Sequence, residues 1–102
     1  MTDINLNAKR DSLNQLRNKI QAIDQKILDL LHERAEIAIE IGRIKRSQHL
    51  PVYDPQRERE LLDLLIQNNK SPLSEEGITQ IFSTIMDEFK KLQQVADQKS
   101  SS

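Results

Sequence analysis

The sequence predicts an all-α protein with three helices per chain, one of them very long, that pairs with a second copy of itself. Apolar residues recur at alternating spacings of three and four between Leu13 and Ile44, which is the pattern of a heptad seam. No proline precedes Pro51 and no glycine precedes Gly42, so nothing interrupts this helix for most of its length. No segment alternates apolar and polar residues in the way typical of a β-strand.

The first helix is expected to run from about Ala8 to about Ser47. At 1.5 Å per residue it would be roughly 60 Å long, whereas a compact globule of about 100 residues is roughly 34 Å across. About half of the seam would then lie in water unless another chain covers it. We therefore expect a homodimer in which the two long helices lie antiparallel. The seam consists of Leu13, Leu16, Ile20, Ile23, Ile27, Leu30, Ile37, Ile41 and Ile44.

Two shorter helices are expected to follow. Asp54-Pro55 is a strong helix start, with Asp as N-cap and Pro at the first helical position, and this helix should run to about Asn68. Ser74 is the expected N-cap of the third helix, which should end near Ala96. Their inward faces are predicted from the helical spacing of Leu61, Leu62, Leu65, Ile78, Ile81, Phe82, Ile85, Met86, Phe89 and Leu92.

Composition limits the class of protein. With 102 residues, 36% of them hydrophobic and 3% aromatic, the chain is expected to form one domain over residues 1–102 with an aliphatic core, and residues 1–7 and 97–102 are expected to be disordered. The net charge of -1 provides no overall field for nucleic acid or for an anionic membrane surface. Cysteine, a signal peptide and a transmembrane stretch are all absent from the sequence, so we expect a free-standing cytoplasmic domain.

One charged residue occurs where the seam calls for an apolar one, and a second charged residue lies on the same face. Arg34 takes a seam position, and Lys45 lies eleven positions further on, a rotation of only about 20° and a rise of about 16 Å along the helix. Two cations on one face would bracket a small ligand with carboxylate groups. An ordinary salt bridge for each residue is the alternative interpretation.

Arg17 supports the ligand interpretation only if two chains pair. It lies about 25 Å from Arg34 along the same helix, too far to share a small ligand within one chain. Antiparallel pairing about the centre of the seam places position 17 of one chain opposite position 40 of the other, between Arg34 and Lys45. The dimer would therefore gather three cations around one cavity, twice.

The shorter helices add further polar residues to this site. Asp54, Arg57 and Glu58 share one face of a first helical turn, and Gln93 continues the apolar stripe of the third helix. Such a cluster suits a dicarboxylate that carries a hydroxyl group, although a solvated ion network at the rim is the alternative. The sequence offers no Ser-His-Asp set, no phosphate-binding glycine loop and no metal-ligand cluster. We therefore expect a site without metal or cofactor, which acts by orientation and electrostatic stabilisation.

An ordered set of short motifs resembles the AroQ-type, all-helical chorismate mutases. The resemblance covers about residues 13–94 and is specific because of the order and spacing of its parts. These are Leu16-Arg17-x-x-Ile20-x-x-Ile23-Asp24, Leu31-x-Glu33-Arg34, Gly42-x-x-Lys45, Pro51-Val-x-Asp54-x-x-Arg57-Glu58, Ile81-Phe82 and Leu92-Gln93.

The resemblance implies an intertwined homodimer with two active sites that converts chorismate to prephenate, toward phenylalanine and tyrosine. In that family the reaction is a Claisen rearrangement that uses no cofactor, metal or covalent intermediate. By position, Arg34 and the partner chain's Arg17 would hold the substrate carboxylates, and Lys45 and Gln93 would donate to the ether oxygen. Glu58 and the backbone near Asp54 would take the ring hydroxyl, with Arg57 in support.

One residue departs from the family pattern, and two other functions remain open. Phe89 stands where many relatives have a small or hydroxyl residue four positions before the glutamine, and its ring would narrow the carboxylate pocket. The first alternative function is an isochorismate pyruvate-lyase-like enzyme, which would use a similar cationic helical pocket. The second is a non-catalytic helical dimerisation or regulatory module.

Overall fold

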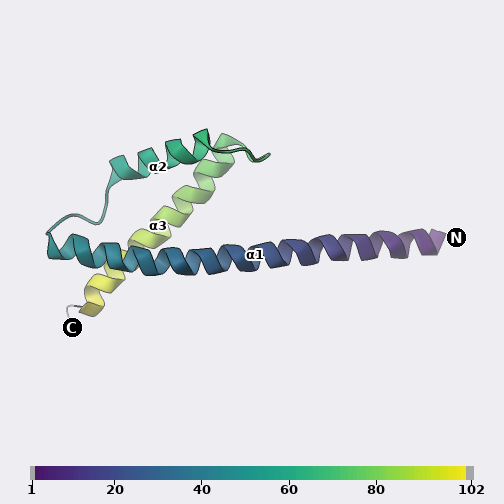
Figure 1. The fold of residues 1–102 in the computed structure, drawn as a ribbon, viewed down its shortest axis with the longest axis horizontal. Coiled ribbons are helices and arrows are strands. Elements are labelled where there is room, and N and C mark those ends of the chain that lie inside the picture. The colour runs from purple at the N-terminus through teal and green to yellow at the C-terminus, as the bar shows by residue number, and fades with distance from the viewer. Residues whose placement is uncertain (1, 101–102) are drawn as a thin grey trace. The chain divides into compact units, whose positions relative to one another are not determined.

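The computed structural model describes the backbone of residues 2–100 and the side chains of residues 6–94. Three helices follow one another, α1 (Thr2–Ser47), α2 (Pro55–Gln67) and α3 (Glu75–Ser100), and the described residues include no strand (Figure 1). The predicted all-α class with one very long helix is therefore confirmed. The chain divides into two units, Met1–Arg34 and Ala35–Ser102, and α1 belongs to both.

The helix bounds differ from the expected ones at the two ends of the chain. Helix α1 begins at Thr2 instead of about Ala8, and α3 continues to Ser100 instead of about Ala96. Neither added segment contains proline or glycine, so nothing in it stops a helix that has already begun. The disorder expected for residues 1–7 and 97–102 stays a prediction, and residues 1, 101 and 102 lie outside the described part of the chain.

The N-terminal unit is a single helical segment with an open apolar stripe. From Leu13 to Leu30 the six seam residues are 47–62% exposed in the single chain. A continuous apolar stripe of this kind is typical of a helix that packs against another chain. No described helix combines the length and the apolarity needed to cross a membrane.

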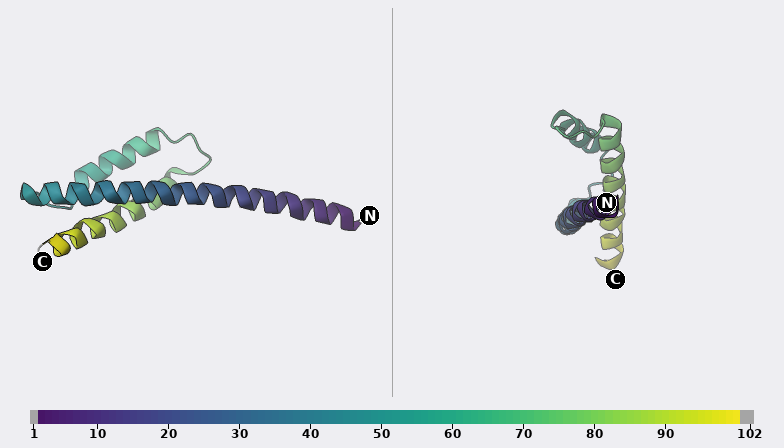
Figure 2. Two further views of the ribbon diagram at one scale, coloured as in Figure 1. Left: turned by 60° about the horizontal axis from the view of Figure 1, so that its bottom comes forward. Right: turned by 90° about the vertical axis from the view of Figure 1, so that its right-hand side faces the viewer.

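The second unit contains the core. It consists of the end of α1, the following loop, α2 and α3, with α2 packed against α3 (Figures 1 and 2). Residues of α2 are at most half-buried, so this helix covers the core from outside. The most buried apolar side chains, 5–9% exposed, are Ala38, Ile78, Met86 and Phe89.

Gly42 allows α1 and α3 to approach closely. A Cβ atom at position 42 would lie 3.3 Å from Cβ of Gln93 and 3.4 Å from its Cα, which is tighter than ordinary van der Waals contact. A glycine at this position lets the backbone of α1 lie directly against the Gln93 segment of α3.

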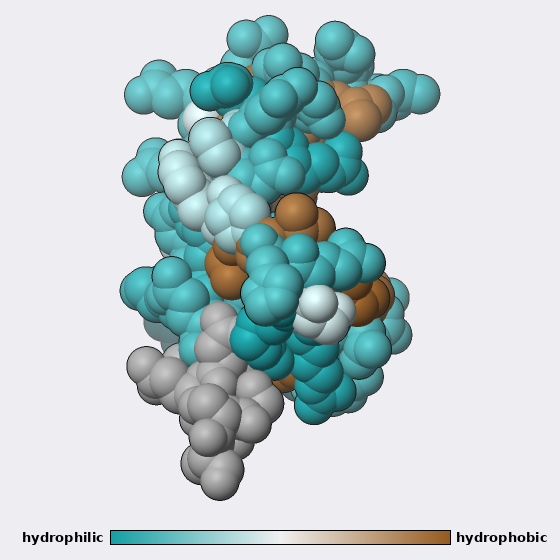
Figure 3. Space-filling model, turned by 90° about the vertical axis from the view of Figure 1, so that its left-hand side faces the viewer, coloured by the Kyte–Doolittle hydropathy of each residue, from teal (hydrophilic) through white to brown (hydrophobic). Residues whose placement is uncertain are grey.

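Helix α1 ends in a turn that sends the chain back along its last residues. His49 has a φ angle of 58°, in the left-handed region, and the Leu50 amide donates to the carbonyl oxygen of Lys45 at 2.7 Å. This is the hydrogen-bond pattern of a Schellman motif, and Pro51 then prevents further helix. Figure 3 views this end of α1, where separate hydrophobic patches lie among hydrophilic side chains.

Both predicted N-caps are present. The Asp54 carboxylate accepts a hydrogen bond from the Arg57 amide at 3.1 Å, and the Ser74 hydroxyl accepts one from the Gly77 amide at 3.0 Å. Each cap satisfies an amide that the first turn of a helix leaves without an intrahelical partner. The cap on α2 fixes where its first turn begins, and this sets the position of Glu58 in that turn.

Candidate active site

The predicted site residues are divided between the two units. Arg17 lies on the exposed surface of the N-terminal unit, and Arg34 lies at its end, partly buried. Burial lowers the pKa of Arg34 from its ordinary value, but an arginine remains charged at neutral pH. The second unit holds the other five predicted residues, which are Lys45, Asp54, Arg57, Glu58 and Gln93.

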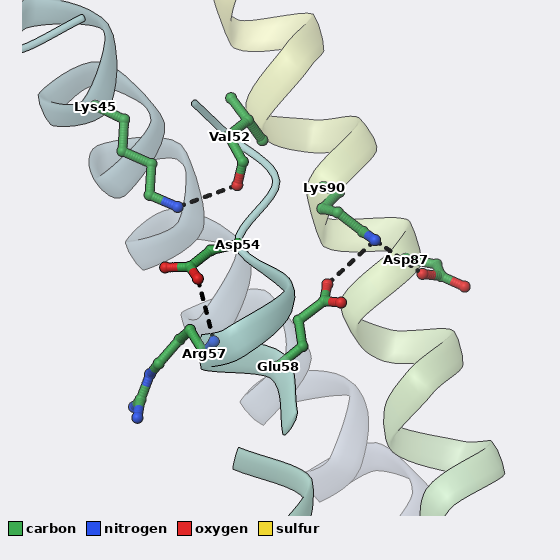
Figure 4. A network of polar contacts seen from close by, with 7 residues as sticks. All are labelled: Lys45, Val52, Asp54, Arg57, Glu58, Asp87 and Lys90. Atoms are coloured by element: carbon green, nitrogen blue, oxygen red, sulfur yellow. Dashed lines mark hydrogen bonds and ion pairs between the residues drawn. The ribbon is translucent and has the colours of Figure 1, made fainter. Parts of the chain in front are cut away.

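Lys45 points from the last turns of α1 toward the loop that returns along it. Its ammonium donates a part-buried hydrogen bond to the carbonyl oxygen of Val52 at 3.1 Å (Figure 4). The turn at His49 makes this contact possible because it reverses the chain within a few residues. An ammonium has three N–H donors, so two remain to bind a ligand.

The side chains of Asp54 and Arg57 have local partners in α2. Asp54 serves as the N-cap, while the exposed Arg57 guanidinium lies 3.7 Å from the Glu60 carboxylate. In Figure 4, Arg57 points away from Glu58 and from α3. Their roles in substrate binding stay predictions.

Glu58 lies in a cluster that sequence reasoning missed. One of its carboxylate oxygens, Oε1, is 3.1 Å from the Lys90 ammonium, which also lies 3.2 Å from Oδ1 of Asp87 (Figure 4). The same ammonium is 4.4 Å from the centre of the Tyr53 ring. The hydrogen bond to Glu58, followed by that to Asp87, raises the pKa of Lys90. The spacing of three between Asp87 and Lys90 was the only sign of this cluster in the sequence.

Gln93 faces inward from α3, as predicted. It is half-buried against Gly42, and its amide oxygen Oε1 is buried without a hydrogen-bond partner among the described residues. Leaving such a group unpaired costs about 1–3 kcal/mol, a cost that a bound ligand or water relieves. Phe89 lies one turn earlier on α3 and is buried, so its ring belongs to the core, and its effect on a ligand pocket stays a prediction.

Donors and an acceptor therefore come from three elements of one unit. Lys45 of α1 and Gln93 of α3 offer polar hydrogens, and Glu58 of α2 offers carboxylate oxygens. Within the described residues no group of three or more His, Cys, Asp or Glu side chains gathers to hold a metal ion. Groups of these kinds form hydrogen bonds to the oxygen atoms and hydroxyl groups of small molecules.

Comparison with known sequences finds one family. A family model described as chorismate mutase type II matches residues 16–94. The bifunctional chorismate mutase/prephenate dehydratase of Escherichia coli strain K12 is 46% identical over 74 residues, which is 72% of this chain and 19% of that protein. The protein of the same description from Aquifex aeolicus is 45% identical over 60 residues, 59% of this chain and 17% of that protein. The chain thus spans about a fifth of the length of these relatives.

Solved structures show the same fold over nearly their whole length. A chorismate mutase from Thermus thermophilus (form II) superposes with a TM-score of 0.79 at 35% identity, covering 80% of this chain and 93% of that one. A chorismate mutase from Helicobacter pylori in complex with prephenate also gives a TM-score of 0.79, at 37% identity, covering 84% and 93%.

Proposed function

Because this chain belongs to the type II chorismate mutase family, we propose that it converts chorismate to prephenate. In this Claisen rearrangement a C–O bond breaks while a C–C bond forms within one molecule, so no group has to be transferred to the protein. The amide oxygen of Gln93, which is buried without a hydrogen-bond partner among the described residues, carries the proposal, because buried polar atoms in a purely structural role are normally paired. Prephenate leads toward phenylalanine and tyrosine, and the proposed reaction would serve their synthesis.

We infer that Lys45 and Gln93 stabilise the transition state. Negative charge grows on the ether oxygen as the C–O bond breaks, and donors fixed beforehand lower the energy of that state more than that of the substrate. The two uncommitted N–H groups of Lys45 support this role. For Gln93, rotation of the amide by half a turn exchanges its oxygen for its NH₂ group, which then donates.

The remaining predicted residues would bind and orient the substrate. We propose that Arg34 and the partner chain's Arg17 hold the two carboxylates, since arginine binds a carboxylate through two parallel hydrogen bonds. Glu58 and the backbone near Asp54 would accept the ring hydroxyl, and Arg57 would support them. Holding both ends of the substrate favours the folded conformer from which the new C–C bond forms.

We further propose that the active form is a homodimer with antiparallel long helices and shared sites. The exposed seam between Leu13 and Leu30 supports it, because a second copy of the same seam would cover these side chains. Arg17 enters a site only from a partner chain, as its distance from Arg34 along one helix requires. A cytoplasmic location stays a prediction from the sequence.

An assay with two substrates tests the function. The purified chain is incubated with chorismate and, separately, with isochorismate, and the products are separated and identified. Prephenate formed from chorismate is the expected result. Salicylate and pyruvate formed from isochorismate would favour the lyase, while no turnover of either by a folded dimer would favour a non-catalytic module.

A further inference from the structure

We propose that Lys90 is a positioning residue, which fixes the Glu58 carboxylate so that its second oxygen receives the hydroxyl of the substrate. The inference rests on the proposed function and adds Lys90, together with Tyr53 and Asp87, to the site. The evidence is the geometry of the cluster, which joins the loop before α2, the first turn of α2 and the middle of α3 (Figure 4).

The Lys90 ammonium already has a partner in each direction in which it donates. Of its three N–H groups, one faces Oε1 of Glu58 at 3.1 Å and another faces Oδ1 of Asp87 at 3.2 Å. The remaining side faces the Tyr53 ring at 4.4 Å, a cation–π distance. Lys90 is thus held as a fixed charge, and the Glu58 carboxylate that it positions would contact the substrate.

The Glu58 carboxylate, in contrast, is only half used. The Lys90 ammonium lies 3.1 Å from Oε1, and among the described residues no hydrogen bond to Oε2 is found. A carboxylate accepts hydrogen bonds at both oxygens, so Oε2 is ready for an O–H donor. With Oε1 anchored to α3, rotation of the Glu58 side chain is restricted before the substrate arrives, which reduces the entropy lost on binding.

The Lys90–Glu58 pair differs from ordinary surface pairs. Both side chains are 25% exposed, and the pair links α2 to α3 through residues 32 positions apart in the sequence. Three other pairs, Arg43–Glu40, Arg57–Glu60 and Lys91–Glu88, each join residues three apart in one helix and are more than half exposed. Water competes less for the Lys90 pair, so it holds a more definite geometry.

The test compares Lys90→Gln with Lys91→Gln in the full chain, using steady-state turnover of chorismate. A hydroxyl contact binds substrate and transition state alike, so its loss raises KM and leaves kcat nearly unchanged. We expect Lys90→Gln to raise KM about tenfold and Lys90→Arg to restore most of the loss. Lys91→Gln, which removes the neighbouring exposed pair with Glu88, should match the wild type. A purely structural role would lower the fraction of active enzyme and leave KM unchanged, which would overturn the inference.

A double substitution shows whether Lys90 acts through Glu58. In a Glu58→Gln background, Lys90→Gln should raise KM no further, because the carboxylate it positions is gone. Effects of the two substitutions that multiply would mean that Lys90 meets the substrate itself, and would overturn the inference. So would an unchanged KM in Lys90→Gln while the wild type turns over chorismate. If the wild type itself is inactive toward chorismate, the proposed function fails first, and the two failures are thereby distinguished.

Discussion

At the scale of single residues, Lys45 and Gln93 are donors held in place by different means. The loop carbonyl of Val52 holds the ammonium of Lys45, and close packing against Gly42 holds the first carbons of the Gln93 side chain. Their contribution to catalysis would therefore come from being positioned before the substrate binds.

Replacing Lys45 tests its contribution to catalysis. Lys45→Ala should lower kcat by an amount equivalent to about 3 kcal/mol or more, because the ether oxygen loses a charged donor in the transition state. Steady-state kinetics give the effect, and size-exclusion chromatography checks that the oligomeric state is retained. Arg43→Ala is the control, since Arg43 is exposed on the same helix and pairs with Glu40 one turn away. Turnover of Lys45→Ala close to the wild-type value would remove Lys45 from the catalytic group.

Sequence reasoning succeeded for residues whose position a helix determines and failed where a tertiary contact decides. Gln93 was placed inward because it continues a helical stripe, and the structure buries its amide oxygen. Lys90 was missed because its main partner, Glu58, belongs to another helix. Only the packing of α2 against α3 brings the two together, and spacing along one helix carries no information about it.

At the scale of elements, the first turn of α2 controls where Glu58 lies. The Asp54 carboxylate caps this turn, and Pro55 sets the backbone for it. Both features were readable in the sequence because capping is local chemistry. The N-terminal end of α1 and the C-terminal end of α3 were less predictable, since no proline or glycine in these two segments stops the helix.

Removing the cap tests the link between helix start and substrate binding. Asp54→Ala should lower the free energy of unfolding by about 1 kcal/mol and raise KM for chorismate, because the turn that carries Glu58 loosens. Denaturant unfolding and steady-state kinetics measure the two effects. Asp54→Asn keeps a capping oxygen and should resemble the wild type in both. Equal KM values for the alanine and asparagine variants would separate the cap from the site.

The contact between α2 and α3 through Lys90 predicts a pH dependence of stability. Because Glu58 and Asp87 raise the pKa of Lys90, its stabilising effect is complete below the ordinary lysine value of 10.5 and is lost as pH rises through the raised value. Lys90→Met should therefore lower the free energy of unfolding by about 1 kcal/mol at neutral pH, and less and less above pH 10.5. Denaturant titrations at several pH values measure this difference. A difference that grows with pH would contradict the ion-pair explanation.

At the scale of the whole molecule, the exposed seam is the largest feature the single chain leaves unexplained. Its spacing was read from the sequence, and the structure leaves its side chains about half exposed. The periodicity of the seam predicts that another helix packs against it but does not identify that helix. The prediction of a second copy as the partner rests on the length of α1. The antiparallel homodimer with a shared site is the proposal that this seam and Arg17 together support.

Mixing two inactive variants tests the shared site. Arg17→Ala and Arg34→Ala should each be nearly inactive, because each removes a carboxylate ligand from every site. In a heterodimer, one of the two sites receives both arginines from unmutated positions and should regain activity. We expect mixed chains to recover up to about a quarter of wild-type turnover for random exchange of subunits. No recovery, with exchange verified by mass spectrometry, would rule out sites built from two chains.

The exposed seam on α1 also affects how enzyme activity depends on the concentration of the protein. If catalysis needs two subunits, then below the dissociation constant the concentration of dimer follows the square of the chain concentration. Halving synthesis would then cut activity about fourfold instead of twofold. Monomers, in which the apolar seam is uncovered, would meanwhile be the form that chaperones and proteases bind. A modest drop in expression would therefore lower the rate of the reaction more than in proportion.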